Sequence, residues 1–386
     1  MNALMSGLTD EQATLVEALR DFCRRECGTR EQRDALTGGG REAHSETVYA
    51  KLAEAGYLGI SIPEEYGGAG GDLMDQCLLH EELYRGLAPV HAIGGTHTVA
   101  GIYKRFATET QKKDVLGAIA NGSPMAISIS EPEAGSDAAN IACQAVRRGD
   151  EFVINGQKTW CSAAQHAAGI LLVARTSRTG KRHEGLSMFY VPVDAPGLQI
   201  RPIETMGGPL VNDLYFTDVV VPASAMVGQE GGGWSQLMAG LNGERLVAAA
   251  QALGMAQRTF DDLLDYVRVR KQFGQPIGSF QAVRHRIADL AIEIEAAQAL
   301  HYSTVQRLQA AREPAQVLVR LTSMTKVKVT ETAKQTALEG MQLMGGYGYA
   351  VEYGMEKHLR DAVAPPIYAG TNEIQREVIS SSYGLR

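Results

Sequence analysis

The chain has 386 residues, of which 45% are hydrophobic and 21% charged. This balance is typical of a globular protein and excludes a chain that is disordered overall. At about 150 residues per domain, the length predicts two or three structural units. Lys and Arg number 37 against 44 Asp and Glu, and the net charge of −7 excludes a global basic field for DNA or RNA. A local site for a small phosphorylated ligand stays open.

Cysteine usage and the absence of long apolar runs bear on the compartment. The cysteines are odd in number and scattered through the chain: Cys23, Cys27, Cys77, Cys143 and Cys161. This pattern favours a reducing compartment and structural thiols, and no second pair or His cluster completes a metal site. The N-terminus has no basic leader, and no segment approaches the ~18 apolar residues of a membrane span. We therefore expect a soluble, cytoplasmic protein without a metal.

Helical patterns dominate residues 8–122. Thr9 with Gln12 predicts a capping box at the start of a first helix, and a second helix is expected over residues 72–84. The glycine-rich segment 61–71 between them is expected to be a loop. It does not contain the dinucleotide fingerprint G-x-G-x-x-G, because position 73 is Leu. A nicotinamide-binding Rossmann site is therefore disfavoured.

Strand patterns replace helical ones between residues 123 and 231. Asn155-Gly156 lies between two runs of strand-forming residues and predicts a hairpin turn there. Further apolar runs at 170–174, 187–193 and 214–221 predict a small antiparallel sheet domain.

Long helices are expected again from Trp234 onward. Apolar residues recur at helical spacing over 246–267, 283–297 and 322–344, and Gly345-Gly346 is a plausible C-terminal cap. The last helix is expected to begin after Thr371. The pattern predicts three packed units with boundaries at 1–122, 123–231 and 232–386.

Three segments have compositions that suggest chemistry. Residues 128–137 place hydroxyls, carboxylates and glycine on a turn after an apolar strand, residues 342–349 join a helix end to a glycine-rich loop, and residues 368–374 contain a helix N-cap. Such segments present backbone N–H groups to polar ligands or phosphates. On composition alone, an ordinary turn, an ordinary helix end and a structural N-cap remain the simpler interpretations.

Together these segments resemble the acyl-CoA dehydrogenase family over nearly the whole chain. Five stretches occur in the family's order: 129–136, 158–160, 270–274, 342–361 and 368–375. The resemblance implies an α+β fold with an N-terminal helical domain, a middle antiparallel β domain and a C-terminal four-helix bundle. It also implies a homotetramer, with FAD between the β domain and the C-terminal helices and its adenosine end reaching a neighbouring subunit.

The resemblance also assigns site residues. For the flavin ring these are Ser130, Trp160 and Ser162; for the adenosine diphosphate part Arg270, Phe273, Gln281, Gln342, Gly345 and Gly346; and near the phosphates Thr371 and Glu373. For the acyl-CoA they are Ser136, Asn242, Arg245, Ala369 and Gly370. Many relatives have Thr in place of Ser162 and Asp in place of Asn242, so a hydroxyl is kept and a charge is lost.

The catalytic base differs from that of most relatives. An α-proton is so weakly acidic that the base must have a raised pKa, and most relatives supply a Glu where this chain has Ala369. The isovaleryl-CoA and long-chain branches of the family supply it from the helix that here contains Glu244. A Glu on an amphipathic helix is more often a surface residue, but the neighbouring apolar run and the coincidence with Ala369 favour Glu244 as the base. The backbone N–H of Ala369 can still donate to the thioester oxygen.

The predicted function is an FAD-dependent acyl-CoA dehydrogenase of fatty acid or branched-chain oxidation. It would form a trans-2-enoyl-CoA and pass electrons to an electron-transfer flavoprotein. Two alternatives stay open at this point: an acyl-CoA oxidase, and a non-catalytic acyl-CoA-binding homologue. The sequence does not predict the length or branching of the acyl chain.

Overall fold

The computed structural model describes residues 7–178 and 180–385. They form two compact units, each built from separate stretches of the chain. The helical unit contains the residues up to Thr29, Leu73–Ala88 and Glu244–Arg386. The sheet unit contains Arg30–Asp72 and Pro89–Gly243.

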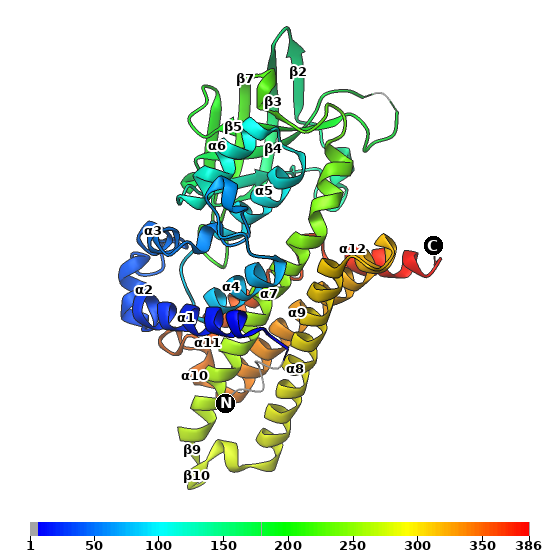
Figure 1. The fold of residues 1–386 in the computed structure, drawn as a ribbon. Coiled ribbons are helices and arrows are strands. Elements are labelled where there is room, and N and C mark those ends of the chain that lie inside the picture. Colours follow the sequence, from blue (N-terminus) through cyan, green and yellow to red (C-terminus); the bar gives the residue numbers. More distant parts are fainter. Residues whose placement is uncertain (1–6, 179, 386) are drawn as a thin grey trace. The chain divides into compact units, whose positions relative to one another are not determined.

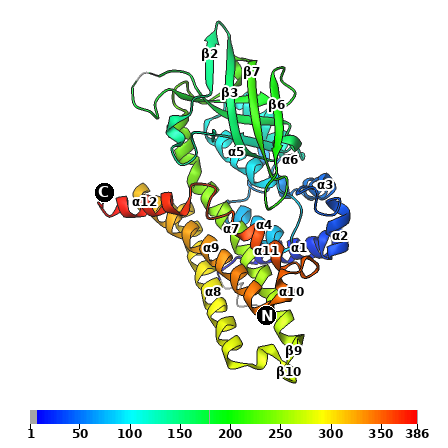
Figure 2. The same ribbon diagram turned by 180° about the vertical axis from the view of Figure 1, so that it is seen from behind.

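Long helices make up the helical unit (Figure 1). They are α1 (Asp10–Cys27), α4 (Leu73–Arg85), the larger part of α7 (Gly233–Val269), α8 (Gln281–Ala310), α9 (Ala315–Met344) and α12 (Asn372–Ser382), with the shorter α10 (Gly346–Tyr349) and α11 (Met355–Ala362). A two-stranded ribbon, β9 (Lys271–Gln272) with β10 (Gln275–Pro276), connects α7 to α8. Helices α8 and α9 run side by side, and α12 packs on α9 (Figures 1 and 2).

Small side chains allow the long helices to approach closely. Ala249, Ala252 and Ala256 of α7 pack with Ala297 of α8 and Ala333 of α9 in one buried cluster. A second cluster joins α1, α4, α7 and α8 through larger apolar residues. Burial of these faces supplies the main stabilisation, at roughly 25 cal/mol per Å² of apolar surface removed from water.

The expected helix ends are found where side chains or glycine satisfy the terminal backbone groups. Thr9 and Gln12 form the capping box of α1, and Thr371 caps α12 by accepting a hydrogen bond from the backbone N of Ile374. Helix α9 ends at Met344 and is capped by Gly345, whose φ of 61° few other residues adopt. The glycine-rich segment after it is not the predicted loop, because Gly346–Tyr349 form the short helix α10.

The sheet unit contains an eight-stranded sheet in the order β6-β7-β3-β2-β4-β5-β8, with β1 paired to β4. The strands are β1 (Met125–Ser128), β2 (Gln144–Arg148), β3 (Glu151–Ser162), β4 (Gly169–Arg175), β5 (Leu186–Pro192), β6 (Leu198–Ile203), β7 (Val211–Pro222) and β8 (Met226–Val227). Most pairs are antiparallel, as expected, but β1 and β2 both pair with β4 in parallel. The helices of this unit are α2 (Arg30–Leu36), α3 (Glu46–Glu54), α5 (Ile93–Phe106) and α6 (Glu109–Ala120).

Both faces of the central strand β4 are buried. Leu171 and Val173 point to a core that includes residues of α5 and α6, whereas Ile170 and Leu172 point to a core with Phe189 and other strand residues. Successive side chains of a strand alternate between faces, so the sheet separates two apolar layers. This explains why β4 is apolar throughout instead of alternating.

The predicted hairpin turn at Asn155-Gly156 is wrong. Strand β3 continues from Glu151 to Ser162, and the turn lies earlier, between β2 and β3. Gly156 marks a register shift against β7, with a φ of 147°, and a Cβ there would lie 2.7 Å from the Cα of Cys143. The glycine therefore permits a close approach between strands, and Asn155 uses its side chain to bind Asp218.

The fold class is confirmed, with a helical N-terminal region, a sheet-rich middle region and a helical C-terminal region. The five cysteines are buried and unbonded to one another by disulfides. Within the described ranges, no helix is both long and apolar enough to span a membrane.

Candidate active site

The loop after β1 is anchored by a buried ion pair in the sheet unit. Lys158 of β3 donates from Nζ to the backbone O of Ile129 at 2.7 Å and to Oε1 of Glu131 at 2.8 Å. The Glu131 carboxylate also accepts hydrogen bonds from the backbone N of Ala142 and of Cys143. Burial lowers the pKa of Lys158, and the Glu131 charge opposes that shift. This arrangement fixes the loop that contains Ser130 and Ser136.

Ser130 is tied to Thr159, the residue before Trp160. The backbone N of Thr159 donates to the O of Ser130 at 2.9 Å, which ties the loop to β3. Trp160 has a φ of 61° and is 59% exposed, beside a second register shift in β3. A bulky residue in the left-handed region is strained, and such strain concentrates at ligand sites. The exposed indole offers a flat apolar face next to a polar loop.

Ser162 follows two residues after Trp160 at the end of the same strand. Cys161 between them is buried, and its thiol donates to the O of Ile127. Burial raises the pKa of Cys161 to about 12, so the thiol stays protonated and has a packing role. Ser136 is exposed, farther along the same loop as Ser130.

A pocket of about 520 Å³ in the helical unit brings together Arg270, Gly345 and Gly346. Tyr347 also lines it, and the Arg270 guanidinium lies 4.7 Å from the centre of that ring. The space beside the two glycines is open, so a ligand can approach the backbone closely. A cation, free backbone and an aromatic face suit a phosphorylated aromatic ligand such as a nucleotide.

Three other residues predicted for the same ligand do not line this pocket. Phe273 is 93% exposed with a φ of 52°, and Gln281 and Gln342 are also exposed. Within this single chain, therefore, Phe273, Gln281 and Gln342 do not line the same pocket as Arg270.

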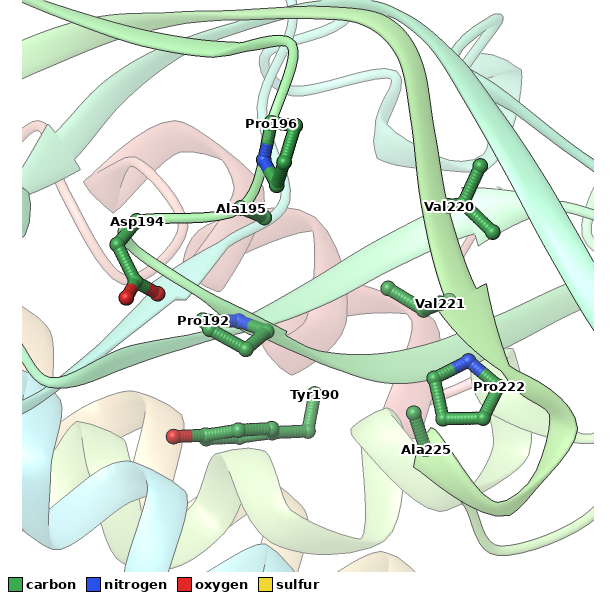
Figure 3. A pocket seen from close by; sticks show the side chains of 9 residues that line it. All are labelled: Tyr190, Pro192, Asp194, Ala195, Pro196, Val220, Val221, Pro222 and Ala225. Carbon is green, nitrogen blue, oxygen red and sulfur yellow. The ribbon is translucent and has the colours of Figure 1, made fainter.

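A second pocket, of about 360 Å³, lies in the sheet unit (Figure 3). Three prolines and two valines line it, with Tyr190 and Asp194 at one side. It contains none of the predicted site residues and is not part of the site described here.

Glu244 is a partly buried carboxyl group in α7. Its Oε2 atom is fully covered and has no hydrogen-bond partner among the residues that the structure describes. Burial raises the pKa of Glu244, and the adjacent Arg245 charge only partly opposes this. A surface glutamate would have neither property, so the simpler interpretation of this residue does not hold.

The turn before α12 has an unusual backbone. Ala369 has a φ of 53° and Gly370 a φ of 79°, and the carbonyl oxygens of both accept hydrogen bonds from Nε2 of Gln375. Glu373 lies in the first turn of α12, where hydrogen bonds from its own backbone N–H and from Thr371 lower its pKa. The same N-terminal amides can receive another anion.

Three domain profiles of one family match most of this chain. They are the acyl-CoA dehydrogenase N-terminal domain over residues 9–123, the middle domain over 126–219 and the C-terminal domain over 231–384. The chain belongs to the acyl-CoA dehydrogenase family. The family's reaction, the FAD-dependent dehydrogenation of an acyl-CoA, is therefore the reaction of this enzyme.

Individual relatives match this chain over nearly their full lengths. The probable acyl-CoA dehydrogenase YngJ of Bacillus subtilis is 36% identical over 382 residues, covering 97% of this chain and 98% of that protein. The crystal structure of an acyl-CoA dehydrogenase from Geobacillus kaustophilus matches with a TM-score of 0.91 at 33% identity, covering 98% and 100% of the two chains. A caffeyl-CoA reductase-Etf complex subunit, CarC of Acetobacterium woodii, is 33% identical over 96% of this chain and 97% of its own.

The described residues fit FAD, the family's cofactor. The exposed Trp160 beside Ser130 offers a stacking face and polar groups for a flavin ring. In the other unit, the pocket at Arg270 has the open glycine backbone and the cation that a pyrophosphate requires.

Sequence reasoning missed the residues that hold the site in place. Tyr347 stands inside a predicted motif, and an aromatic residue between two glycines was the available signal. Glu131 and Lys158 lie in two of the stretches that carry the resemblance, but nothing in the sequence signalled their pairing, because the two residues are 27 positions apart and meet only in the folded sheet unit.

Proposed function

We propose that this acyl-CoA dehydrogenase uses Glu244 as its catalytic base. The observation that carries the proposal is a covered carboxylate oxygen without a partner, in a chain whose other candidate position is Ala369. An unpaired buried carboxyl group is unfavourable for stability, so a catalytic use is a reason to keep it.

The reaction begins with a proton transfer to the Glu244 carboxylate from Cα of the acyl thioester. The electron pair of that C–H bond moves towards the thioester carbonyl, whose oxygen gains negative charge. The backbone N–H of Ala369 donates to that oxygen, and this role does not depend on its side chain. When bound, FAD accepts the hydride that leaves Cβ, which yields the trans-2-enoyl-CoA.

The remaining assigned residues bind and orient the two ligands. Arg270, with Gly345 and Gly346, holds the diphosphate of FAD, and the α12 N-terminus with Thr371 supports its phosphates. Ser136, Asn242 and Arg245 line the path of the acyl-CoA. Asn242 contributes an amide where many relatives have a charge, so it can hydrogen-bond the thioester arm without adding a carboxylate.

We also propose a homotetramer that passes electrons to an electron-transfer flavoprotein. Phe273, Gln281 and Gln342 are exposed in the single chain, so a neighbouring copy's cofactor can cover them. The name of the Acetobacterium woodii relative places that protein in an Etf complex. The preference between short branched and long straight acyl chains requires a substrate panel.

Glu244→Gln tests the base. The variant should keep its FAD and its unfolding temperature but lose acyl-CoA turnover by about 10²- to 10⁴-fold, the usual contribution of a general base. Asp265→Asn, which removes an exposed carboxylate from the same helix, is the matched control. Bleaching of the flavin by acyl-CoA under anaerobic conditions measures the chemical step directly. A rate within about threefold of the wild type would exclude Glu244 as the base.

The pH profile gives a second readout of the same residue. Because burial raises the pKa of Glu244, the wild-type rate should rise with pH through a limb above the ordinary carboxylate range. The limb should be absent from the residual rate of Glu244→Gln.

Slow reoxidation of the bleached flavin in air would separate a dehydrogenase from an oxidase.

A further inference from the structure

Lys326 is a lysine with no exposed surface in the middle of α9. Its Nζ donates to the backbone O of Gly370 at 3.0 Å and to Oδ1 of Asn372 at 2.9 Å. A buried ammonium is costly unless hydrogen bonds compensate it, and both compensating acceptors here belong to the turn before α12 or to its first residue. No sequence motif of the family marked this lysine.

The partners of Lys326 form a closed, buried network. Nδ2 of Asn372 donates to Oγ1 of Thr330 at 3.1 Å, and Oγ1 of Thr330 donates to the backbone O of Lys326 at 2.8 Å. Lys326, Thr330 and Asn372 are almost entirely inaccessible to solvent. Two residues of α9 that lie one helical turn apart, Lys326 and Thr330, thus fix the start of α12, and fully satisfied networks of this kind are rigid.

The network fixes two peptide groups of the turn, the one between Ala369 and Gly370 and the one between Gly370 and Thr371. Lys326 and Gln375 both donate to the carbonyl of Gly370, and Gln375 also donates to that of Ala369. Both carbonyls are therefore engaged by the protein. The N–H groups of Ala369 and Gly370 have no acceptor among the described residues and stay available to a ligand.

The left-handed conformation of Ala369 needs such support, because the Cβ of alanine makes it unfavourable. A left-handed backbone costs an L-residue with a Cβ about 1–2 kcal/mol, and Ala369 has a φ of 53°. Strained residues persist where the surrounding contacts determine their conformation. Here those contacts are the hydrogen bonds from Gln375 to Ala369 and from Lys326 to the next residue.

We propose that Lys326 is a positioning residue for catalysis: by holding the carbonyl of Gly370, it fixes the turn before α12 in the conformation that directs the amide of Ala369 at the thioester oxygen. The inference rests on the proposed function, in which that amide stabilises the developing charge. Lys326 also lies within electrostatic range of Arg245, since burial first and the Arg245 charge second lower its pKa to about 8.

Lys326→Met in the FAD-loaded enzyme tests the role. Methionine fills similar space without the charge or the donors. We expect kcat to fall about 10²-fold while KM changes less than about threefold, because a misaimed amide affects the transition state more than substrate binding. Lys328→Met is the matched control, since Lys328 lies on the same helix, is partly exposed and binds Glu293 instead. Its kcat should match the wild type.

Proton exchange separates positioning from a merely structural role. Acetyl-CoA has an acidic α-carbon but no Cβ, so exchange of its α-protons in D₂O reports only proton removal and oxyanion support. Lys326→Met should slow this exchange by the same factor as kcat while FAD content and the unfolding midpoint stay close to those of Lys328→Met. Exchange at the wild-type rate, or a loss of activity that only parallels lost FAD or lost folded protein, would overturn the proposal.

A second variant keeps the test decisive if Lys326→Met does not fold. Asn372→Ala removes one acceptor of the ammonium and leaves its bond to Gly370, so the proposal predicts a smaller loss of exchange, about tenfold. An unchanged rate in a folded Asn372→Ala variant would count against it. Failure of the proposed function is recognised differently, because the wild type would then show no acyl-CoA-dependent bleaching or Glu244→Gln would keep full activity.

Discussion

Removing Glu131 should destabilise the sheet unit far more than removing its partner Lys158. Glu131→Ala leaves a buried ammonium with only the Ile129 carbonyl, and it also takes the acceptor from the N–H groups of Ala142 and Cys143. Breaking a buried pair from one side costs about 3–5 kcal/mol because the other charge stays buried. For a unit of this size, each kcal/mol lowers Tm by about 2–4 °C.

The reverse change should cost less. In Lys158→Met, the Glu131 carboxylate keeps both backbone donors, so the expected loss is about 1–3 kcal/mol. The double variant contains no unpaired charge at this position. The double variant should therefore lose about 2 kcal/mol less free energy of unfolding than the two single losses added together, within the range seen for residues in one network.

Urea unfolding at a fixed excess of FAD measures all three variants, since a constant ligand excess keeps its stabilising contribution comparable. Glu230→Ala, which breaks the exposed pair with Arg147 in the same unit, is the control and should change stability by less than about 1 kcal/mol. Additive losses in the double variant would refute the reasoning. So would a Glu131→Ala loss no larger than that of Glu230→Ala.

Two further predictions concern α4 and α7 in the helical unit. Gly254→Ala should lower stability by about 1–3 kcal/mol or more, because its Cβ would lie 2.1 Å from the backbone O of Glu81; Gly101→Ala, with nothing within 4 Å, should raise Tm slightly. Burial, and after it the charge of Glu82, raise the pKa of Glu81 to about 7. Because the folded state binds this proton more tightly than the unfolded state, protonated Glu81 stabilises the fold. This contribution to the free energy of unfolding is lost as pH rises from about 4.5 to 7. Glu81→Gln should remove that loss, on the order of 3 kcal/mol; a pH-independent difference between the two proteins by urea unfolding would contradict this.

Local signals predicted the element ends well because the controlling atoms lie close together in sequence. The capping box at Thr9 and Gln12, the glycine at 345 and the N-cap at Thr371 all act within one helical turn. The apolar periods likewise placed the long helices and most strands. The domain boundaries and the roles of individual site residues remain predictions.

The failures arose where tertiary contacts override local preference. Asn155-Gly156 has the residues of a tight turn, but Gly156 serves a close approach to Cys143, the residue before the neighbouring strand β2. The segment after Gly345 has the glycines of a loop, yet the backbone forms a short helix. The burial of Glu244 could be suspected from the apolar run beside it, but the unpartnered oxygen is visible only in the packed structure.

The hydrogen bond from Lys326 to Gly370, the residue after Ala369, suggests why the turn can lose its usual carboxylate. If the base lies on α7, the turn before α12 contributes only a backbone amide, and the side chain at position 369 is released from catalysis. The conformation of that residue is not released, because the amide must keep its direction. The requirement then falls on residues that never touch the substrate, Lys326 and Gln375, whose hydrogen bonds fix the two carbonyls. Position 369 can therefore lack a carboxylate while the buried Lys326, distant in sequence, preserves the conformation of the turn.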